Sequence, residues 1–191
     1  MKPIILASSS PRRKEILSKL RLPFTVAVSD YEEDMTLPMP PAELAQYLSA
    51  GKARAVAKSH PDAIIIAADT FIIYGNHVLG KPKTEERARE MLRMLSGQEN
   101  DILTGVTILD SSDNHHYSFS EITKVFMKVI SEDTITAYIK TGEPLDKAGA
   151  YALQELGAIL IDRIEGDFFN AMGLPLARLA LELQKFGIRT L

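Results

Sequence analysis

The sequence contains no cysteine, and this absence excludes three kinds of chemistry at once. Disulfide bonds, zinc sites with thiolate ligands and cysteine nucleophiles all require a residue that the chain does not have. A chain without cysteine is also compatible with the cytosol, where disulfides are rare.

Long apolar runs and an excess of basic residues are absent as well. The first apolar run, residues 4–7, is too short for the core of a signal peptide or for a membrane span, and no later run approaches spanning length. The formal net charge is −3 and the pI is about 5.8, so bulk charge does not attract nucleic acid or an anionic membrane. We therefore expect a soluble cytoplasmic protein that binds neither, and any anion that it binds must be held by a local basic site.

What the chain does have is an ordinary globular composition. Its 191 residues are 46% hydrophobic and 25% charged, which is enough for one large domain or for two lobes that share a core. The sequence contains no internal repeat, low-complexity segment or flexible linker. We therefore predict one domain over residues 1–191.

The stretch IIIAADTFIIY at residues 64–74 places one carboxylate, Asp69, and one hydroxyl, Thr70, inside an apolar run. It predicts two strands, residues 63–68 and 71–74, with a break at Asp69 and a hairpin turn at Gly75-Asn76. A buried, unpaired carboxylate costs several kcal/mol, so Asp69 should open into a cleft or lie beside a cation. The alternative is a structural aspartate that accepts backbone N–H groups at the strand break, and this stretch alone does not decide between the two.

Two serines and two arginines, Ser8, Ser10, Arg12 and Arg13, fall where a predicted strand meets a predicted helix. Ser10 is a good helix N-cap, and the proline after it suits the first helical position. Free N–H groups and the helix dipole make such a junction a natural anion site. Two arginines in the first turn oppose the dipole unless an anion lies between them. The alternative is a solvated basic helix start.

An acidic cluster follows the second predicted strand at residues 29–34. Such clusters are usually solvated loops. The alternative is that one of these acids, Glu33, helps to hold a divalent cation, which prefers oxygen ligands.

A glycine, Gly51, lies in the middle of the helix predicted over residues 41–59, next to Lys52. A glycine there costs about 1 kcal/mol relative to alanine. A close approach of something else to the helix backbone would explain it. A lysine on a helix is most often directed to solvent.

Several segments together resemble one family, the Maf nucleotide pyrophosphatases. The resemblance covers essentially the whole chain, in order and at matching spacing. No single segment is specific, but the set is. The segments are LASSSPRR at 6–13, KA at 52–53, ADT at 68–70, GKP at 80–82, LSG at 95–97, DKAGAY at 146–151 and GLP at 173–175.

The resemblance implies an α/β fold akin to the inosine triphosphatase group, with a long mixed sheet flanked by helices and two lobes around a central cleft. It implies a house-cleaning enzyme that hydrolyses a nucleoside triphosphate between the α- and β-phosphates, giving the monophosphate and pyrophosphate. The family requires a divalent cation, usually Mg²⁺, with Mn²⁺ or Co²⁺ as alternatives. A homodimer is compatible with the family.

The resemblance also assigns residues to roles. Asp69 matches the proton acceptor that activates water. The pattern of Arg12, Thr70 and Gln154 resembles the branch that acts on dTTP and UTP, as does Asp146-Lys147. The branch that acts on 7-methyl-GTP has tryptophan, glutamine and glutamate at the three places. Ala152-Leu153 is a mild departure, because glycine and isoleucine are common there.

The chemistry of the reaction assigns further candidates. Attack of water on an α-phosphate needs a base, a metal ion and cations around the leaving pyrophosphate. The amide of Gln154 offers both a donor and an acceptor, which suits a pyrimidine edge. Glu33 and Asp69 are the candidate metal ligands. The candidate phosphate and substrate contacts are Ser8, Ser10, Arg13, Lys52, Lys81 and Lys147.

Two alternatives stay open at this point. One is 7-methyl-GTP hydrolysis within the same family. The other is a non-catalytic inhibitor of septum formation that acts by binding a partner, because the family is linked to the inhibition of cell division.

Overall fold

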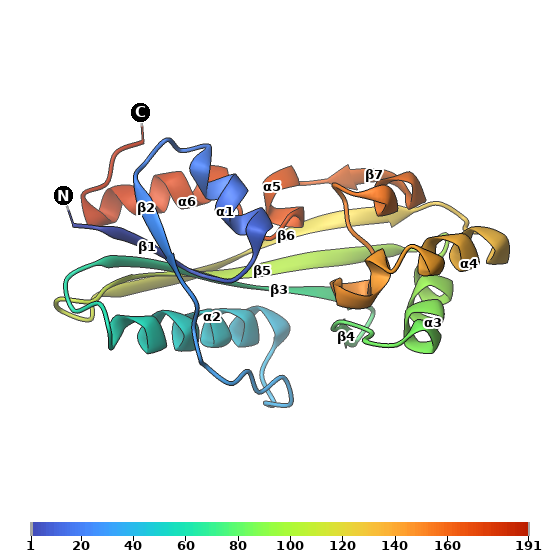
Figure 1. The fold of residues 1–191 in the computed structure, drawn as a ribbon, viewed down its shortest axis with the longest axis horizontal. Coiled ribbons are helices and arrows are strands. Elements are labelled where there is room, and N and C mark those ends of the chain that lie inside the picture. The colour runs from blue at the N-terminus through green and yellow to red at the C-terminus, as the bar shows by residue number, and fades with distance from the viewer. Residues whose placement is uncertain (1, 191) are drawn as a thin grey trace. The chain divides into compact units, whose positions relative to one another are not determined.

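The computed structural model describes residues 2–190, which form two compact units (Figure 1). Unit 1 holds the residues up to Asp69, together with Thr104–Glu121 and the residues from Gly173 onward. Unit 2 holds Thr70–Leu103 and Ile122–Met172. The single domain over residues 1–191 and the central cleft stay predictions.

Strands and helices are interspersed along the chain, with β-hairpins at β3–β4 and β5–β6. The strands are β1 (Ile4–Ala7), β2 (Phe24–Ala27), β3 (Ile64–Tyr74), β4 (His77–Leu79), β5 (Glu99–Asp110), β6 (His116–Met127) and β7 (Ile161–Glu165). The α-helices are α1 (Pro11–Ser18), α2 (Pro41–Ala57), α3 (Glu85–Leu95), α4 (Glu132–Lys140), α5 (Phe168–Ala171) and α6 (Leu176–Leu183). Short 3₁₀ helices are η1 (Glu143–Asp146), η2 (Ala148–Ala150), η3 (Leu156–Leu160) and η4 (Gln184–Phe186). Within residues 2–190, the helices lack the combination of length and apolar character that a membrane crossing requires.

The seven strands form one sheet in the order β2-β1-β3-β5-β6-β7, with β4 paired to β3. Strand β1 pairs in parallel with β2 and β3, whereas the β3–β4 and β6–β7 pairs are antiparallel. The predicted α/β fold with a mixed sheet flanked by helices is therefore confirmed.

The core of unit 1 forms where α2 packs on the first strands. Ile5 of β1 and Ile65 of β3 pair in register and are almost completely buried. Ala53 and Val56 of α2 belong to the same buried cluster. Figure 1 shows α2 on one side of these strands and α6 on the other. With both faces covered, β1 and the first half of β3 are apolar without alternation, which is typical of parallel strands.

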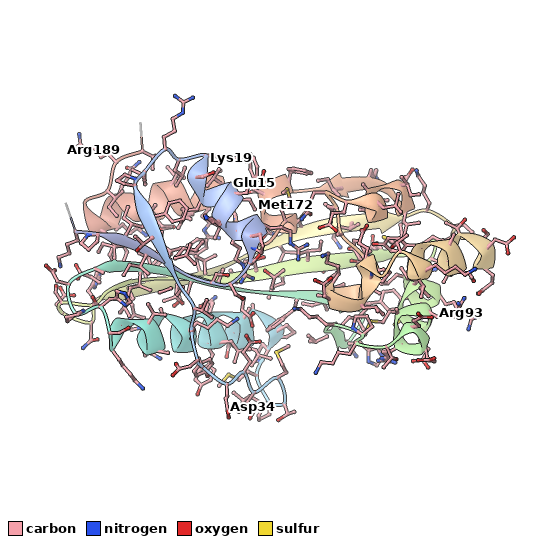
Figure 2. The ribbon with its side chains drawn as sticks, viewed as in Figure 1. Glu15, Lys19, Asp34, Arg93, Met172 and Arg189 are labelled. Atoms are coloured by element: carbon pink, nitrogen blue, oxygen red, sulfur yellow. The ribbon has the colours of Figure 1, made fainter. Side chains whose placement is uncertain are left out.

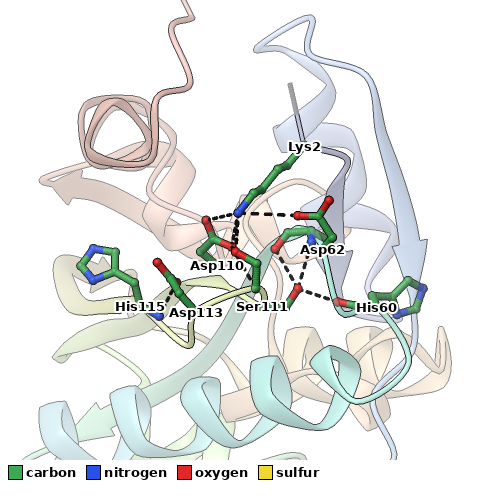
Figure 3. Close-up of polar contacts among 9 residues, drawn as sticks. Lys2, His60, Asp62, Asp110, Ser111, Asp113 and His115 are labelled. Carbon is green, nitrogen blue, oxygen red and sulfur yellow. Dashed lines mark hydrogen bonds and ion pairs between the residues drawn. The ribbon is translucent and has the colours of Figure 1, made fainter.

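A polar network fixes the start of β3 beside the end of β5 (Figure 3). The Ser111 hydroxyl donates to the carbonyl of His60 at 2.5 Å and accepts from the N–H of Ala63 at 2.9 Å. Lys2 donates to the Asp110 carboxylate at 2.7 Å. Burial raises the pKa of Asp110, but the hydrogen bonds from Lys2 and a neighbouring serine outweigh burial, and the net pKa is lowered. Asp110 therefore stays charged at neutral pH.

The core of unit 2 lies under α3 and α4. Leu92 and Leu95 of α3 are fully buried and share a cluster with Ile135 and Ile139 of α4. Arg93, labelled in Figure 2, forms a two-pronged ion pair with a glutamate of α4, at 2.6 and 2.9 Å. The pair lies at the surface and adds little to the free energy of unfolding.

The predicted break in the central stretch is wrong, because β3 runs unbroken from Ile64 to Tyr74. The expected turn after it is present: Tyr74 pairs with His77 across a two-residue turn in which Gly75 has a φ of +56°. The break was inferred from the polar residues that interrupt the apolar run. The strand continues because the cost of burying Asp69 is met by a partner side chain. The short strand β7 was missed because its residues are mostly exposed and carry no apolar alternation.

Candidate functional site

Asp69 lies in the middle of β3 and is only 7% exposed. Its Oδ1 atom accepts a hydrogen bond from Lys52 Nζ at 2.7 Å. Lys52 extends from α2 and is itself buried, so it is not the solvent-directed lysine that is usual on a helix. Of the two interpretations of Asp69, the carboxylate beside a cation is therefore the correct one. Its second oxygen, Oδ2, is buried and has no hydrogen-bond partner among residues 2–190.

Glu33 reaches the same lysine from the segment between β2 and α2. Its Oε1 atom lies 2.8 Å from Lys52 Nζ, so one ammonium group lies between two carboxylates. The Glu33 side chain is 43% exposed, whereas that of Asp69 is 10% exposed. The pair therefore consists of one carboxylate open to water and one withdrawn from it.

The ring of Tyr31 explains the glycine in the middle of α2. A Cβ atom on Gly51 would lie 2.3 Å from Tyr31 Cζ, so only glycine leaves room for the ring. The Tyr31 N–H donates to Ser29 Oγ at 3.1 Å. Asp34, labelled in Figure 2, accepts from the N–H of Thr36 at 2.9 Å. The two hydrogen bonds shape turns within the segment, and the Tyr31 ring packs on α2 beside Lys52, which Glu33 reaches.

Tyr31 was not predicted from the sequence, although Gly51 pointed to the contact that it makes. The mid-helix glycine indicated a close approach, and this expectation is confirmed. The sequence did not indicate which side chain would approach, because nothing local links Tyr31 to α2.

The helix junction supplies a second cation to unit 1. Ser10 caps α1 by accepting from the Arg13 N–H at 3.5 Å, as predicted. Arg13 Nε donates to the carbonyl of Gly173 at 2.9 Å, and Nη1 donates to Ser8 Oγ at 3.4 Å. Gly173 begins the GLP segment at 173–175, one of the segments that resemble the Maf family. The carbonyl group of this segment holds the Arg13 side chain in place. Arg12 is half-buried in the first turn of the same helix.

The electrostatics of Arg13 link it to the two acids. The net pKa of its guanidinium is lowered, chiefly because the group is buried. The two carboxylates, Asp69 and Glu33, oppose this shift, whereas Arg12 adds to it. An arginine pKa starts so far above neutrality that the group stays charged. Unit 1 thus gathers two cations around two carboxylates, an arrangement able to bind an anion and to accept a proton.

The metal-binding capacity of this cluster is limited to two protein ligands. Within the described part of the chain, no three His, Cys, Asp or Glu side chains gather closely enough to hold a metal ion. Mg²⁺ is commonly bound by one or two carboxylates together with water and substrate phosphates. The water-exposed carboxylate of Glu33, with that of Asp69 on the same ammonium group, fits ligands of that kind.

The remaining predicted residues lie in unit 2, on neighbouring segments. The Gly149 N–H donates to the carbonyl of Gly80 at 3.1 Å, so the segments of Lys81 and Lys147 run side by side. Lys81 is exposed. The Lys147 side chain is only 12% exposed and pairs with Asp146 at 3.0 Å and, more distantly, with a second acid. Two cationic side chains are thus carried on adjacent loops.

Gln154 also lies in unit 2, on the loop after η2. Both polar atoms of its carboxamide are buried, and neither has a hydrogen-bond partner among the described residues. A buried polar group without a partner costs about 1–3 kcal/mol. Such a group is expected where a ligand completes the hydrogen bonds. Thr70, the third member of the predicted specificity set, follows Asp69 in β3 and is half-buried.

A family model described as Maf-like protein matches residues 3–186. The chain belongs to this family. The resemblance inferred from the sequence segments is therefore confirmed, and the Maf-like match covers both units.

Relatives from other organisms match along their full length. The relative from Methanosarcina mazei is 52% identical over 189 residues, which are 98% of this chain and 96% of that protein. The relative from Geobacillus is 49% identical over 187 residues, which are 98% of this chain and 100% of that protein. Both relatives carry the name dTTP/UTP pyrophosphatase.

One solved structure supports the fold. It is described as a HAM1 protein from Coxiella burnetii and has a TM-score of 0.58 over 97% of this chain and 100% of that chain. At 15% sequence identity, this likeness concerns the fold alone. It agrees with the fold that the resemblance implied for the Maf-like family.

Proposed function

We propose that this Maf-like protein hydrolyses dTTP and UTP between the α- and β-phosphates. Water attacks the α-phosphorus, the bond to the bridging oxygen breaks, and the products are the monophosphate and pyrophosphate. The names of the relatives support this substrate class. The observation that carries the chemistry is a buried aspartate held through one oxygen by Lys52, with its other oxygen left without a partner.

Asp69 is the proposed general base. The hydrogen bond from Lys52 fixes Oδ1, and this bond orients the carboxylate. The proton of the attacking water would pass to Oδ2, which has no competing donor among residues 2–190. A positioned carboxylate contributes to the rate because it removes the proton as the new bond to phosphorus forms.

The cationic residues are the proposed phosphate contacts. In unit 1 these are Lys52 and Arg13, with Ser8 and Ser10 at the start of α1. In unit 2 they are Lys81 and Lys147 on adjacent loops. Fixed cations aimed at the phosphates would stabilise the charge that develops on the leaving pyrophosphate.

Asp69 and Glu33 are the proposed ligands of a divalent cation such as Mg²⁺. When bound, the cation would neutralise phosphate charge. Lys52 already holds both carboxylates in one place, which keeps two like charges together before the cation arrives.

Gln154, Thr70 and Arg12 are the proposed selectors of the base. The unpartnered amide of Gln154 offers one donor and one acceptor. Uracil and thymine present the complementary pair, a carbonyl and a ring N–H. A base that left the amide unpaired would be rejected strongly.

A substrate panel tests the proposal. Purified protein with Mg²⁺ is offered dTTP, UTP and 7-methyl-GTP, and the products are separated into pyrophosphate and orthophosphate. We expect dTTP and UTP to give the monophosphate and pyrophosphate. A preference for 7-methyl-GTP would assign the chain to the other branch, and the release of orthophosphate would contradict cleavage between the α- and β-phosphates.

Gly51→Ala is expected to change the Mg²⁺ dependence of hydrolysis while leaving the stability of the fold nearly unchanged. Alanine favours the helix by about 1 kcal/mol, but its methyl group occupies the place of the Tyr31 ring. The segment of Glu33 then moves off α2, and we expect a higher Mg²⁺ concentration for half-maximal dTTP hydrolysis, with little loss in melting temperature.

The double variant Gly51→Ala/Tyr31→Ala is the matched control for that experiment. It removes both the clash and the ring that packs on α2, so the Mg²⁺ requirement should stay raised. A return to the wild-type value would show that Glu33 is positioned without Tyr31. An unchanged Mg²⁺ requirement in the single variant would show that Tyr31 does not position Glu33.

A further inference from the structure

The loop of Gln154 lies between two fixed points in unit 2. On one side, the buried Tyr151 donates its hydroxyl to Asn100 Oδ1 at 2.8 Å. On the other side, the N–H groups of Leu156 and Gly157 both donate to the carboxylate of Glu143 at 3.0 Å. The residues that present the carboxamide are therefore held at both ends.

Glu143 receives three donors on its two oxygens. Its Oε1 atom accepts from the Tyr138 hydroxyl at 2.7 Å and from the Gly157 N–H, while Oε2 accepts from the Leu156 N–H. Burial raises the pKa of Tyr138, and the neighbouring carboxylate raises it further, so the phenol stays protonated and donates. The carboxylate of Glu143 thus ties α4 to the loop through hydrogen bonds that only an acceptor can make.

The loop closes tightly on itself at this point. A Cβ atom on Gly157 would lie 2.5 Å from the Tyr138 hydroxyl and 2.7 Å from the carbonyl of Ala152. Ala152 and Gly157 therefore approach each other closely across the base of the loop, and Gln154 lies between them in the sequence. Inside such a closed loop, the direction of the Gln154 side chain depends on the loop ends.

We infer that Glu143 is a positioning residue for base recognition. It holds residues 152–157 so that the buried, unpartnered carboxamide of Gln154 presents a fixed donor and acceptor to the pyrimidine. This inference rests on the proposed function. Glu143 acts through Gln154 and does not itself contact the substrate.

Glu143→Gln is the sharpest single test because it keeps the shape of the side chain and replaces one of its two acceptor oxygens by a donor group. A glutamine offers one acceptor oxygen and one NH₂ group. Whichever way the amide is turned, the NH₂ group faces one of the two backbone N–H groups that now donate to the carboxylate. The loop then loses one of its hydrogen bonds at the end that follows Gln154.

The experiment has two readouts, one of discrimination and one of loop order. The first compares kcat/KM for dTTP with that for dCTP, whose base presents a donor where thymine presents an acceptor. We expect Glu143→Gln to raise KM for dTTP and to lower the dTTP/dCTP ratio about 10- to 100-fold, with little change in kcat. The second measures hydrogen exchange, in which the amide of Leu156 or that of Gly157 should lose protection.

Two further variants complete the design. Glu132→Gln is the matched control, because it makes the same change at a surface ion pair of α4 and should leave both readouts unchanged. Gln154→Ala should lower the dTTP/dCTP ratio at least as much as Glu143→Gln, without loss of amide protection at Gly157.

The outcomes separate the inference from the function on which it rests. Discrimination that survives in Glu143→Gln but is lost in Gln154→Ala would overturn the positioning role of Glu143. Discrimination that survives in Gln154→Ala would overturn the role of Gln154 and the inference with it. A wild-type chain that does not hydrolyse dTTP or UTP would overturn the proposed function and the discrimination part of the inference, while hydrogen exchange would still decide whether Glu143 holds the loop.

Discussion

Replacing Asp69 by asparagine is expected to lower kcat for dTTP hydrolysis by about 10²- to 10⁴-fold, the usual contribution of a positioned acid or base. Asparagine keeps the shape of the side chain and an oxygen that can accept from Lys52, so the contact at 2.7 Å can persist. It cannot take a proton from water. The rate should therefore fall while the fold and the binding of dTTP are kept.

Binding and stability decide whether the loss is chemical. We expect calorimetric titration with dTTP to give a dissociation constant close to the wild-type value, and thermal unfolding to shift little, because Lys52 retains Glu33 as a charged partner. Asp62→Asn is the matched control, since it makes the same change at an exposed aspartate and should retain full activity. An Asp69→Asn variant that hydrolysed dTTP at the wild-type rate would show that Asp69 is not the base.

The same variant tests the alternative in which the chain inhibits septum formation by binding a partner. A chain that binds dTTP but does not hydrolyse it should no longer affect septum formation if hydrolysis carries that effect. Division that is still blocked when the variant is overproduced would assign the effect to partner binding instead.

Local sequence signals predicted the ends of elements well. Ser10 caps α1 by accepting from the N–H three residues ahead, and this cap was visible in the sequence. The turn at Gly75 was predicted for the same reason. These features depend only on residues that are close in the sequence, so a short stretch of chain is enough to predict them.

Side-chain partners from distant segments were not predictable in the same way. The sequence required a cation or an opening beside Asp69 and offered Arg13, Lys52 and Lys81 as the cations, but it did not decide which of them makes the direct contact. That contact comes from Lys52, which lies 17 residues away on a helix. Glu143 was not recognised as a candidate, because its partners at Leu156 and Gly157 lie 13 and 14 residues further along the chain. In both cases the partner is fixed by packing between elements, which periodicity and local propensity do not encode.

Replacing Lys52 by methionine is expected to lower the free energy of unfolding by about 3 kcal/mol or more, the cost of breaking a buried ion pair by removing one partner. Methionine fills a similar volume but leaves Asp69 as a buried carboxylate with no hydrogen bond to Oδ1 from this position. Hydrolysis should also be lost, since the variant lacks a proposed phosphate contact. Urea denaturation measures the change in stability.

A double variant shows whether the cost comes from the uncompensated charge. Lys52→Met/Asp69→Asn removes both buried charges, and we expect it to recover most of the lost stability because an amide is far cheaper to bury than a carboxylate. Lys58→Met is the matched control, since Lys58 follows α2, is exposed and should not change the unfolding free energy by much. If Lys52→Met were as stable as the wild type, the burial of Asp69 would have to be compensated by Arg13, whose guanidinium senses the same carboxylate. The ion pair would then serve catalysis alone, and the unbroken course of β3 through Asp69 would not depend on Lys52.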